Sequence, residues 1–454
     1  MLVLFGGSVT LTWLLYRWQY AQTTGVFLCF FVLGLMMGEK DGQESVDEGI
    51  VEAVVFSKTV EKPKTMAVDL LLPDDGRQVR CYLWKDERSQ ALRLGQGVVV
   101  RHPTQGFIRS RDWQVGGDGR SRMSRMQRVR LRFLMLRQQL LDRYRFPTGK
   151  PSDTVISEGD ESYVSDGFPV RNDAAYAVLA AMTLGDKSAL TKELRETYSV
   201  TGASHILALS GLHLGIIYLL LYRLTMGRKR FWLSQAAIIV SIWAFVFLTG
   251  MSTSIIRSAT MISIYALFSV AGRHRSPVNL LCFTAIVMLL ISPSALYDIG
   301  FQLSFSAVLA ILLLMPLLEK LFPEDYLITH PFLRAIYNMV GVSLAAQIGV
   351  APLIAYHFGR FSTYFLLTNF IVIPAATVIL YGALLVMLFP PLASVLLWVV
   401  DILNKALEIV SQLPCASIDG LHPSVFQVLC IYVFFLCLYL AARRMVTSQS
   451  PYDH

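Results

Sequence analysis

Apolar segments of membrane-spanning length recur through the second half of the chain. After an expected helix at 173–196, nine of them stand at about residues 204–224, 231–249, 254–271, 277–291, 301–318, 335–356, 363–385, 391–410 and 424–442. A helix needs about 20 apolar residues to cross a hydrocarbon core of roughly 30 Å. The pattern predicts a polytopic α-helical membrane protein with about nine helices in a main bundle over residues 173–445, followed by a short tail at 446–454.

Two further apolar runs lie at the N-terminus, over residues 2–16 and 24–38. Arg17 follows the first run, and the sequence between the two is not typical of a signal-peptidase site. A transmembrane hairpin over residues 1–38 is therefore favoured over a cleaved signal peptide.

Alternating apolar and polar positions replace the long apolar runs between residues 39 and 118. Short strands are predicted at 49–57, 65–72, 78–84 and 97–102. Several short strands in so short a region predict a small β-barrel-like, OB-like domain. Four aromatic residues either stack on nucleic-acid bases or fill the small core, and the sequence leaves both interpretations open: Tyr82, Trp84, Phe107 and Trp113.

Positive charge gathers at the end of this domain. Residues 101–150 hold twelve Arg and one Lys against three Asp, and apolar residues recur between them at helical spacing from Met123 to Tyr144. A basic amphipathic helix binds anionic lipid headgroups, which we favour, or DNA phosphates without sequence preference. The side chains expected to make either contact are Arg120, Arg122, Arg125, Arg128, Arg130, Arg132 and Arg137. An acidic flexible linker completes the segment 119–172.

Composition agrees with a membrane protein and argues against several kinds of site. Of the 454 residues, 54% are hydrophobic and 16% are charged, whereas charged residues make up about 25% of soluble proteins. The six cysteines form no C-x-x-C pair and the eight histidines are scattered. We therefore expect no metal, no disulfide framework and no cofactor.

The first segment of the bundle opens with polar and small residues at 201–216. These are Gly202, His205, Ser210, Gly211, His213 and Gly215. In a single helix, Ser204, Ala208 and the last two glycines form a small-residue stripe that favours close packing, with Ser210 and His213 on the opposite side. Neither side suits lipid, because polar groups within a membrane need partners.

Two later segments also begin with polar residues. Gly250 precedes Arg257, which lies just inside an apolar helix, where an unpaired guanidinium is costly. Another segment opens with Asp298, Gly300, Gln302 and Ser304. We predict an ion pair between Arg257 and Asp298, since both lie at the outer ends of their segments. The alternative is an arginine that snorkels to the interface.

Loop charges orient the bundle. Positive charges stand at Arg223 and 228–230 in one loop, at Arg273 and Arg275 two loops later, and at 443–444 in the tail. Nine crossings place all three groups on one side, which the positive-inside rule makes cytoplasmic. The C-terminus is then cytoplasmic, and residues 39–200 face outward.

The motif T-G-A-S-H-I-L-A-L-S-G-L-H-L-G at 201–215, preceded by L-G-D-K at 184–187, resembles the signature of the ComEC competence family of DNA-internalisation channels. The resemblance continues, in the same order, through 250–259 and through S-P at 292–293 and D-I-G-F-Q-L-S-F at 298–305, with weaker matches at 347–352 and 369–374. It covers roughly residues 173–440. The β-rich region is similar, more weakly, to the OB-like domain of that family.

This resemblance implies a channel in the cytoplasmic membrane through which one DNA strand enters during natural competence. The partners it implies are single-stranded DNA, membrane lipids, a DNA receptor and a cytoplasmic motor, with a homo-oligomer left open. It assigns no catalytic residue. Many members add a C-terminal metallo-β-lactamase-like nuclease domain, which we expect to be missing here, because twelve residues follow Ala442 and no H-x-H-x-D-H cluster occurs. We expect a channel and not an enzyme.

Two other functions fit parts of the sequence. Ser210 and His213, three apart, suit the nucleophile and base of an intramembrane hydrolase, although nothing identifies an oxyanion hole. Asp401, Lys405 and Glu408 mark either an ion- or proton-coupled transporter of small solutes or a structural ion-pair ladder.

Overall fold

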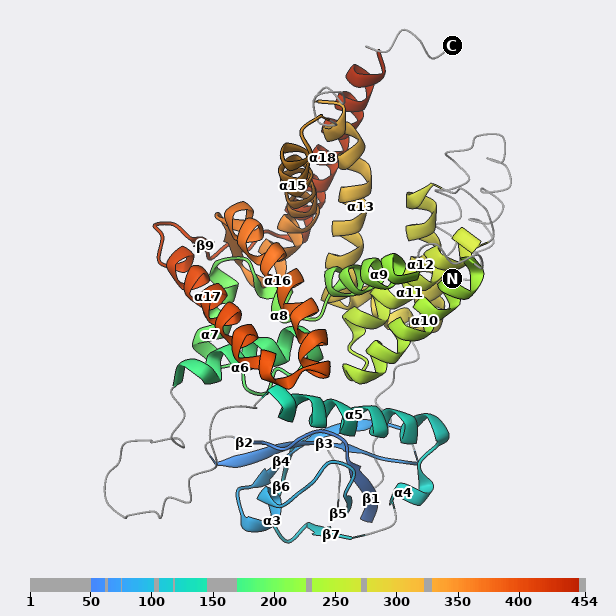
Figure 1. Ribbon diagram of the computed structural model, residues 1–454, viewed down its shortest axis with the longest axis vertical. Helices are drawn as coiled ribbons and strands as arrows, with labels where there is room; N and C mark the ends of the chain where they lie inside the picture. The colour runs from blue at the N-terminus through green and yellow to red at the C-terminus, as the bar shows by residue number, and fades with distance from the viewer. Residues whose placement is uncertain are drawn as a thin grey trace.

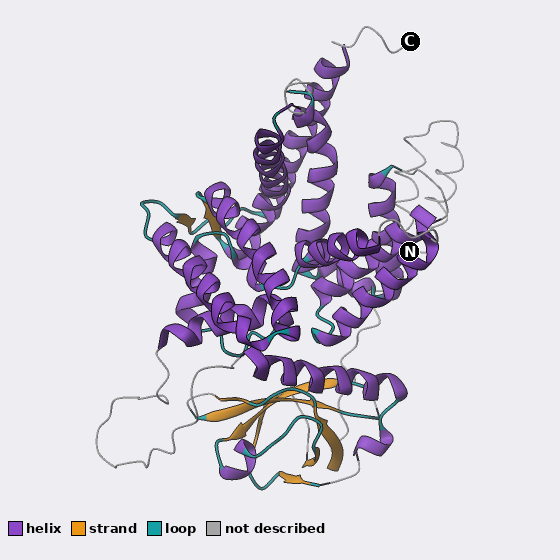
Figure 2. Cartoon of the chain, viewed as in Figure 1, coloured by secondary structure: helices purple, strands orange, loops and turns teal. Residues whose placement is uncertain are grey.

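A computed structural model describes residues 50–448, except 62–63, 75, 102–105, 117–118, 145–169, 226–230, 271–275 and 322–328. The expected hairpin at 1–38, most of the linker at 146–172 and the end of the tail lie outside the described residues. A small β domain occupies one end of the molecule, and helix α5 (Arg125–Tyr144) separates it from the remaining helices (Figure 1). Elsewhere in the described ranges, strands are confined to one short pair (Figure 2).

The β domain is a sheet of seven short strands. They are β1 (Ile50–Val55), β2 (Val60–Glu61), β3 (Thr65–Leu71), β4 (Gln78–Trp84), β5 (Gly97–Arg101), β6 (Gly106–Ile108) and β7 (Trp113–Val115). The order is β6-β4-β3-β1-β5-β7, with β2 beside β3, and the β4–β6 pair is parallel while the other pairs are antiparallel. The four expected strands are confirmed. Alternate residues such as Val79, Cys81 and Leu83 on β4 point into one apolar core.

Helix α5 fills the space between the sheet and the helical region. Leu131 and Leu134 pack with residues of β1 and β3, whereas Leu141 and Tyr144 join the core of the helical region. The expected basic helix is confirmed, but the expected apolar face is wrong in part, because Met126, Val129 and Leu136 are exposed. Apolar residues occur on more than one face of α5. The sheet on one side and the helical region on the other, and not the spacing alone, therefore decide which of these residues are buried.

The helical region contains α6 (Val170–Leu184), α7 (Lys192–Val200), α8 (Ser204–Leu207), α9 (Gly211–Thr225), α10 (Phe231–Leu248), α11 (Thr253–Val270), α12 (Pro277–Ile291), α13 (Ile299–Glu319), α15 (Pro331–Phe358), α16 (Phe365–Leu388), α17 (Ala393–Ser411) and α18 (Val425–Ser448). Each expected apolar segment overlaps at least one of these helices. Among the described helices, six are long and apolar enough to cross a membrane: α10, α11, α13, α15, α16 and α18. The chain is therefore a multi-pass membrane protein.

Two boundaries differ from the sequence expectation. The helix expected at 173–196 is two helices, α6 and α7, because Gly185 follows α6 with a φ of +71°, which ends the helix in the left-handed region. The tail expected at 446–454 begins inside α18, which continues to Ser448.

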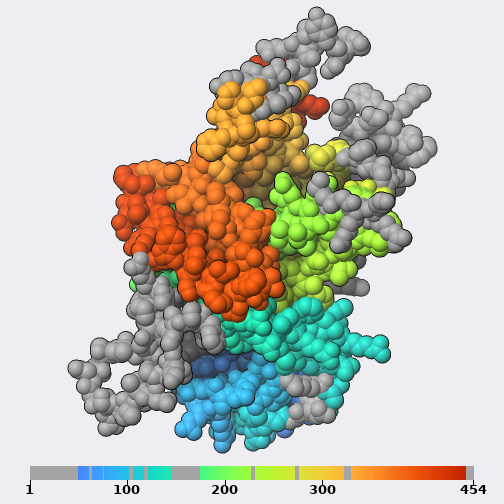
Figure 3. Space-filling view, viewed as in Figure 1, coloured from blue at the N-terminus to red at the C-terminus, as the bar shows by residue number. Residues whose placement is uncertain are grey.

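The helices do not form one parallel bundle. Helices α13, α15 and α18 extend away from the β domain, whereas α6, α16 and α17 lie between them and α5 (Figure 1). In the space-filling view, the green segment that contains α9–α11 and the orange segment that contains α16 and α17 stand side by side on α5 (Figure 3).

Two helix ends that are far apart in the chain both contact α5. Arg130 donates to the carbonyl of Gly250, just after α10, at 3.4 Å, and Arg143 donates to the carbonyl of Met387, near the end of α16, at 2.9 Å. Five described helices separate these two carbonyls along the chain. The expected alternation of nine crossings stays a prediction.

Candidate functional site

The stretch 201–216 is not one helix. Helix α8 covers only Ser204–Leu207, Ala208 has an extended backbone with φ −92° and ψ 125°, and α9 begins at Gly211. The expected continuous small-residue stripe is therefore wrong, because the break separates Ser204 and Ala208 from the glycines of α9.

A side-chain cap explains where α9 begins. The backbone N–H of Ser210 donates to Nδ1 of His213 at 3.3 Å, and the Ser210 hydroxyl lies 3.1 Å from the same nitrogen. His213 occupies the third position of α9 and is 1% exposed. A side chain at this position that reaches back to the N–H before the helix is half of a capping box. The spacing S-x-x-H is the sequence signal for this cap. It is easily overlooked, because a capping box is usually recognised as S-x-x-E.

The two glycines of α9 differ in their surroundings. A Cβ at Gly211 would lie 3.1 Å from the Ser258 hydroxyl of α11, so α9 and α11 approach closely there. A Cβ at Gly215 would meet nothing within 4 Å. The expected packing role fits Gly211 and is wrong for Gly215, which is exposed together with His205.

The loop before α8 is held by a strand pair, β8 (Arg360–Ser362) with β9 (Ser417–Asp419). Gly202 has a φ of +80°, and a Cβ there would lie 3.0 Å from Cβ of Ser362. Both features favour glycine at this position.

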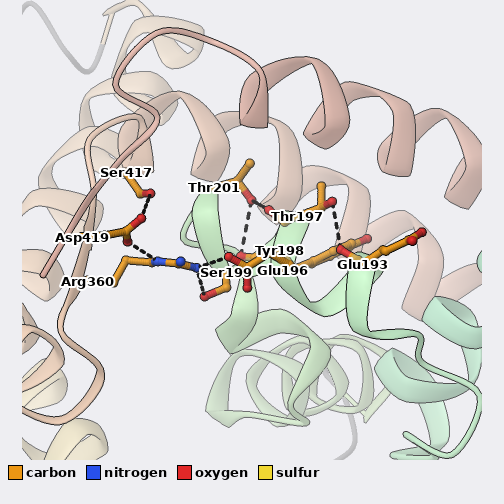
Figure 4. Close-up of polar contacts among 9 residues, drawn as sticks. All are labelled: Glu193, Glu196, Thr197, Tyr198, Ser199, Thr201, Arg360, Ser417 and Asp419. Carbon is orange, nitrogen blue, oxygen red and sulfur yellow. Dashed lines mark hydrogen bonds and ion pairs between the residues drawn. The ribbon is translucent and has the colours of Figure 1, made fainter.

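Arg360 fastens this strand pair to α7 (Figure 4). Its guanidinium contacts Glu196 at 2.8 Å, donates to Ser199 at 3.1 Å, and pairs with Asp419 of β9. The sequence does not reveal this cluster, because its members lie far apart in the chain and share no motif.

The predicted pair of Arg257 and Asp298 is confirmed at 3.5 Å. The Arg257 side chain is 5% exposed, so the snorkelling alternative is wrong. Asp298 also accepts from the N–H of Phe301 at 3.1 Å and thereby caps α13. A Cβ at Gly300 would lie 2.7 Å from the guanidinium, and the Ser304 hydroxyl accepts from Arg257 at 3.5 Å. The guanidinium of α11 therefore sits against the first turn of α13.

Gln302 extends this polar cluster to a third helix. Its Nε2 donates to the carbonyl of Leu296 at 3.0 Å, and its Oε1 lies 3.1 Å from Nε2 of His357 on α15. His357 was not singled out by the sequence. The expected residues of the third motif thus come together, and they connect α11, α13 and α15.

A second junction lies where α5 meets the first two motifs. Asp186, from L-G-D-K, lies 3.9 Å from Arg137 of α5. A Cβ at Gly185 would lie 2.6 Å from Leu209, and a Cβ at Gly250 would lie 3.4 Å from Arg137. Residues of the first two motifs therefore share a single contact region with α5.

The arginines of this region divide into two groups. Arg130 and Arg137 turn inward, and burial lowers the pKa of both guanidinium groups. Arg130 also stacks over the Phe56 ring, with 5.0 Å from Cζ to the ring centroid. Arg125, Arg128 and Arg132 are exposed along one side of α5. The inward pair is engaged within the protein, and contact with lipid or DNA stays a prediction for all five of these arginines.

The two remaining arginines in this set lie before α5, in α4 (Gly119–Arg122). Arg122 lies 3.8 Å from Glu52 and 3.6 Å from Asp74, so it is partly engaged with the β domain. The side chain of Arg120 lies outside the described part of the chain.

The charged residues of α17 have a local explanation. Lys405 lies 3.4 Å from Asp401 one turn away on α17, which is the geometry of an ion-pair ladder. In the described ranges, no group of three or more His, Cys, Asp or Glu side chains is placed to hold a metal ion.

The motifs that meet at these junctions fall within one family model. The model of the competence protein family matches residues 182–445. The chain belongs to the competence protein family. This match includes all of the helices from α7 to α17 and nearly all of α18.

Relatives align over parts of the chain. ComE operon protein 3 of Bacillus subtilis is 26% identical over 60% of this chain and 35% of its own length. An uncharacterized protein of Aquifex aeolicus is 31% identical over 41% of each chain. Recombination protein 2 of Haemophilus influenzae is 23% identical over 47% of this chain and 28% of its own. The chain thus spans less than half the length of these relatives. No solved structure matches it.

Proposed function

We propose that this protein forms the path by which a single DNA strand crosses the cytoplasmic membrane during natural competence. The observation that carries this proposal is the competence-family match over residues 182–445, the region that holds the three ordered motifs and their polar contacts. Relatives named ComE operon protein 3 and Recombination protein 2 support a role in DNA uptake.

The surroundings of the first motif suit the wall of a conduit. His205 and Gly215 are exposed, and a Cβ at Gly215 would meet no atom within 4 Å. Nδ1 of His205 lies 2.9 Å from the carbonyl of Gly202, and the rest of this exposed imidazole does not suit lipid, because an intramembrane polar group needs a partner or water. A water-filled path beside α9 satisfies this requirement.

The proposed orientation puts the β domain, as an OB-like domain, on the outer side. Helix α18 ends on the side away from that domain (Figure 1) and carries Arg443 and Arg444 in its last turns, so this end is cytoplasmic by the positive-inside rule. A DNA receptor outside and a motor inside complete the route. Non-sequence-specific DNA and membrane lipids are its direct partners, and homo-oligomers fit the same scheme.

We assign no catalytic step to the chain. In a Ser-His pair that acts as nucleophile and base, the second ring nitrogen is oriented by a third group. Nδ1 of His213 already accepts from the backbone of Ser210, which is a capping function, and Asp298 is engaged with Arg257. Local capping thus accounts for the pair without hydrolysis.

Replacing Gly211 by Leu tests the proposed path. The new side chain would meet Ser258 within van der Waals distance, so it would displace α9 from α11. The expected result is loss of transformants in a strain whose membranes still contain the variant at the wild-type amount. Val240→Leu, at a position of α10 that is 69% exposed, is the matched control and should transform normally. Normal transformation by the Gly211→Leu strain would refute the proposal.

A further inference from the structure

Two large aromatic side chains of the β domain are exposed side by side. Trp84 ends β4 and is 48% exposed, and Phe107 lies in the middle of β6 and is 47% exposed. Their ring centroids are 5.1 Å apart with the planes at 88°. Aromatic side chains bury large areas in cores and interfaces, so an exposed pair marks a contact surface.

The pair belongs to a row of side chains on one face of the sheet. Val79, Cys81 and Leu83 of β4 are buried, so Gln78, Arg80, Tyr82 and Trp84 share the outer face. Tyr82 pairs with Phe107 in the parallel register of β4 and β6. Trp113, by contrast, is 3% exposed and belongs to the core. Of the two interpretations of the aromatics, core filling is confirmed for Trp113, whereas base stacking stays a prediction for the other three.

The row leads from the far side of the domain to α5. Gln78, at its inner end, lies 3.5 Å from Arg130, which also contacts Gly250. Trp84 stands six residues farther along the strand, about 20 Å away at the usual rise of an extended chain. Helix α3 (Glu87–Gln90), which follows β4, lies on the side of the domain away from the helical region (Figure 1). The aromatic end therefore points away from the membrane-spanning part, which argues against lipid as its partner.

Charge identifies the kind of partner. Residues 50–144, which form the β domain and α5, contain nineteen Lys and Arg against ten Asp and Glu. Arg80, beside the aromatics, keeps its guanidinium 65% exposed although it pairs with Asp69 at 2.7 Å. Exposed aromatic rings in a positively charged setting bind single-stranded nucleic acid, because unpaired bases offer their faces for stacking while cations hold the phosphates. In a duplex those faces are already stacked.

We propose that Trp84, Phe107 and Tyr82 form a base-stacking platform for single-stranded DNA. The platform receives the strand before it passes along Arg80 and Gln78 to the junction of α5 with Gly250. This inference rests on the proposed uptake function and adds to it the point at which the protein first holds the strand and the side chains that stack on its bases.

The test uses the full chain in nanodiscs of zwitterionic lipid. Fluorescence anisotropy measures its affinity for a labelled oligothymidylate of about 20 nucleotides, long enough to cover one such site. The double variant Trp84→Ala with Phe107→Ala should bind at least about tenfold more weakly, since each lost base stack costs about five- to a hundredfold. The control pair, Ile50→Ala with Val115→Ala, removes exposed apolar residues from β1 and β7 and should bind as wild type does.

An abasic oligonucleotide of equal length separates stacking from a folding defect. It keeps the phosphates and lacks the base faces, so wild type and the aromatic double variant should bind it equally. If the double variant binds the abasic strand more weakly too, the substitutions act through the fold and the platform is refuted.

Equal binding of the oligothymidylate by wild type and the aromatic double variant would also overturn the platform. If the double variant then also fails to transform although its DNA binding is unchanged, the surface is a protein contact. Neither result bears on the uptake proposal, whose failure would appear separately, as normal transformation by the Gly211→Leu strain.

Discussion

Asp298 has two functions that a pair of substitutions can separate. Its carboxylate pairs with Arg257 of α11, and it also accepts from the N–H of Phe301 to cap α13. Asparagine is as good a cap as aspartate, so Asp298→Asn removes the charge and keeps the cap. Asp298→Ala removes both.

The exposure of the two side chains sets the expected magnitudes. Removing one partner of a fully buried ion pair costs about 3–5 kcal/mol, because the other charge is left in the interior. Arg257 is 5% exposed but Asp298 is 35% exposed, so solvent screening reduces the expected loss for Asp298→Asn to about 2 kcal/mol. Loss of the cap adds about 1 kcal/mol, which gives about 3 kcal/mol for Asp298→Ala.

Equilibrium unfolding of the purified protein in mixed SDS–detergent micelles measures these free energies. Tyr297→Phe, at a neighbouring position that is 68% exposed, is the control and should unfold as wild type does. If Asp298→Asn were as stable as wild type, the ion pair would contribute nothing and the reasoning would fail. If the Asn and Ala variants were equally unstable, the cap would be the part refuted.

The double variant Arg257→Met with Asp298→Asn asks whether the charge pair is only structural. Without the guanidinium no unpaired charge stays buried, so the free energy of unfolding should return most of the way to wild type. This double variant should fail to transform if the guanidinium also meets DNA phosphates along the proposed path. A double variant that transforms normally would assign the pair to helix packing alone.

Three further predictions use the same unfolding assay. His213→Gln should keep the acceptor for the Ser210 N–H, whereas His213→Ala should lose about 1 kcal/mol; equal losses would contradict the capping function. Gly349→Ala should destabilise more than Gly341→Ala, by about 1–3 kcal/mol, because the new Cβ would lie 2.6 Å from the backbone of α13 at Ser306, whereas at Gly341 its nearest contact would be the flexible end of Met315 at 3.0 Å; the reverse order would refute this. Burial raises the pKa of Tyr144 from about 10 in the unfolded chain to about 12 in the folded protein. Below about pH 10 the side chain is neutral in both states, and about 2–3 kcal/mol of the free energy of unfolding should be lost as the pH rises from 10 to 12. Tyr144→Phe should remove that part of the alkaline loss, and an unchanged profile would argue against it.

Element positions followed from local periodicity. The alternation of apolar and polar residues located β1, β3, β4 and β5, and the long apolar runs located the helices from α9 to α18, because side-chain period and element type are directly linked. The break between α8 and α9 was missed, since a histidine at the third helical position is a rare cap and the flanking residues are all compatible with a helix.

The direction of individual side chains was less predictable. Arg125 and Arg137 lie three turns apart on the same helix, yet the first is exposed and the second faces Asp186. Residue type gives the charge of a helix but does not say which partner covers each face. Arg360 is the extreme case, since its partners on α7 are about 160 residues earlier in the chain and only the fold brings them together.

The contacts of the signature residues divide them into two classes. Asp298 and His213 satisfy backbone donors at the starts of α13 and α9, and Gly202 and Gly250 permit close contact with β8 and α5. These residues shape helix ends, and substituting them would alter the fold before it altered any ligand.

His205 and Gly215 belong to the other class, because both are exposed and neither satisfies a backbone donor at the start of a helix. Polar or small residues at exposed positions of a membrane segment are costly or neutral for stability, so stability does not account for them. If a DNA strand passes this region, these are the positions of the first motif that it would meet. Substitutions at His205 and Gly215 should therefore change transport with the least change in folding, which makes them better probes of the path than the buried histidine beside them.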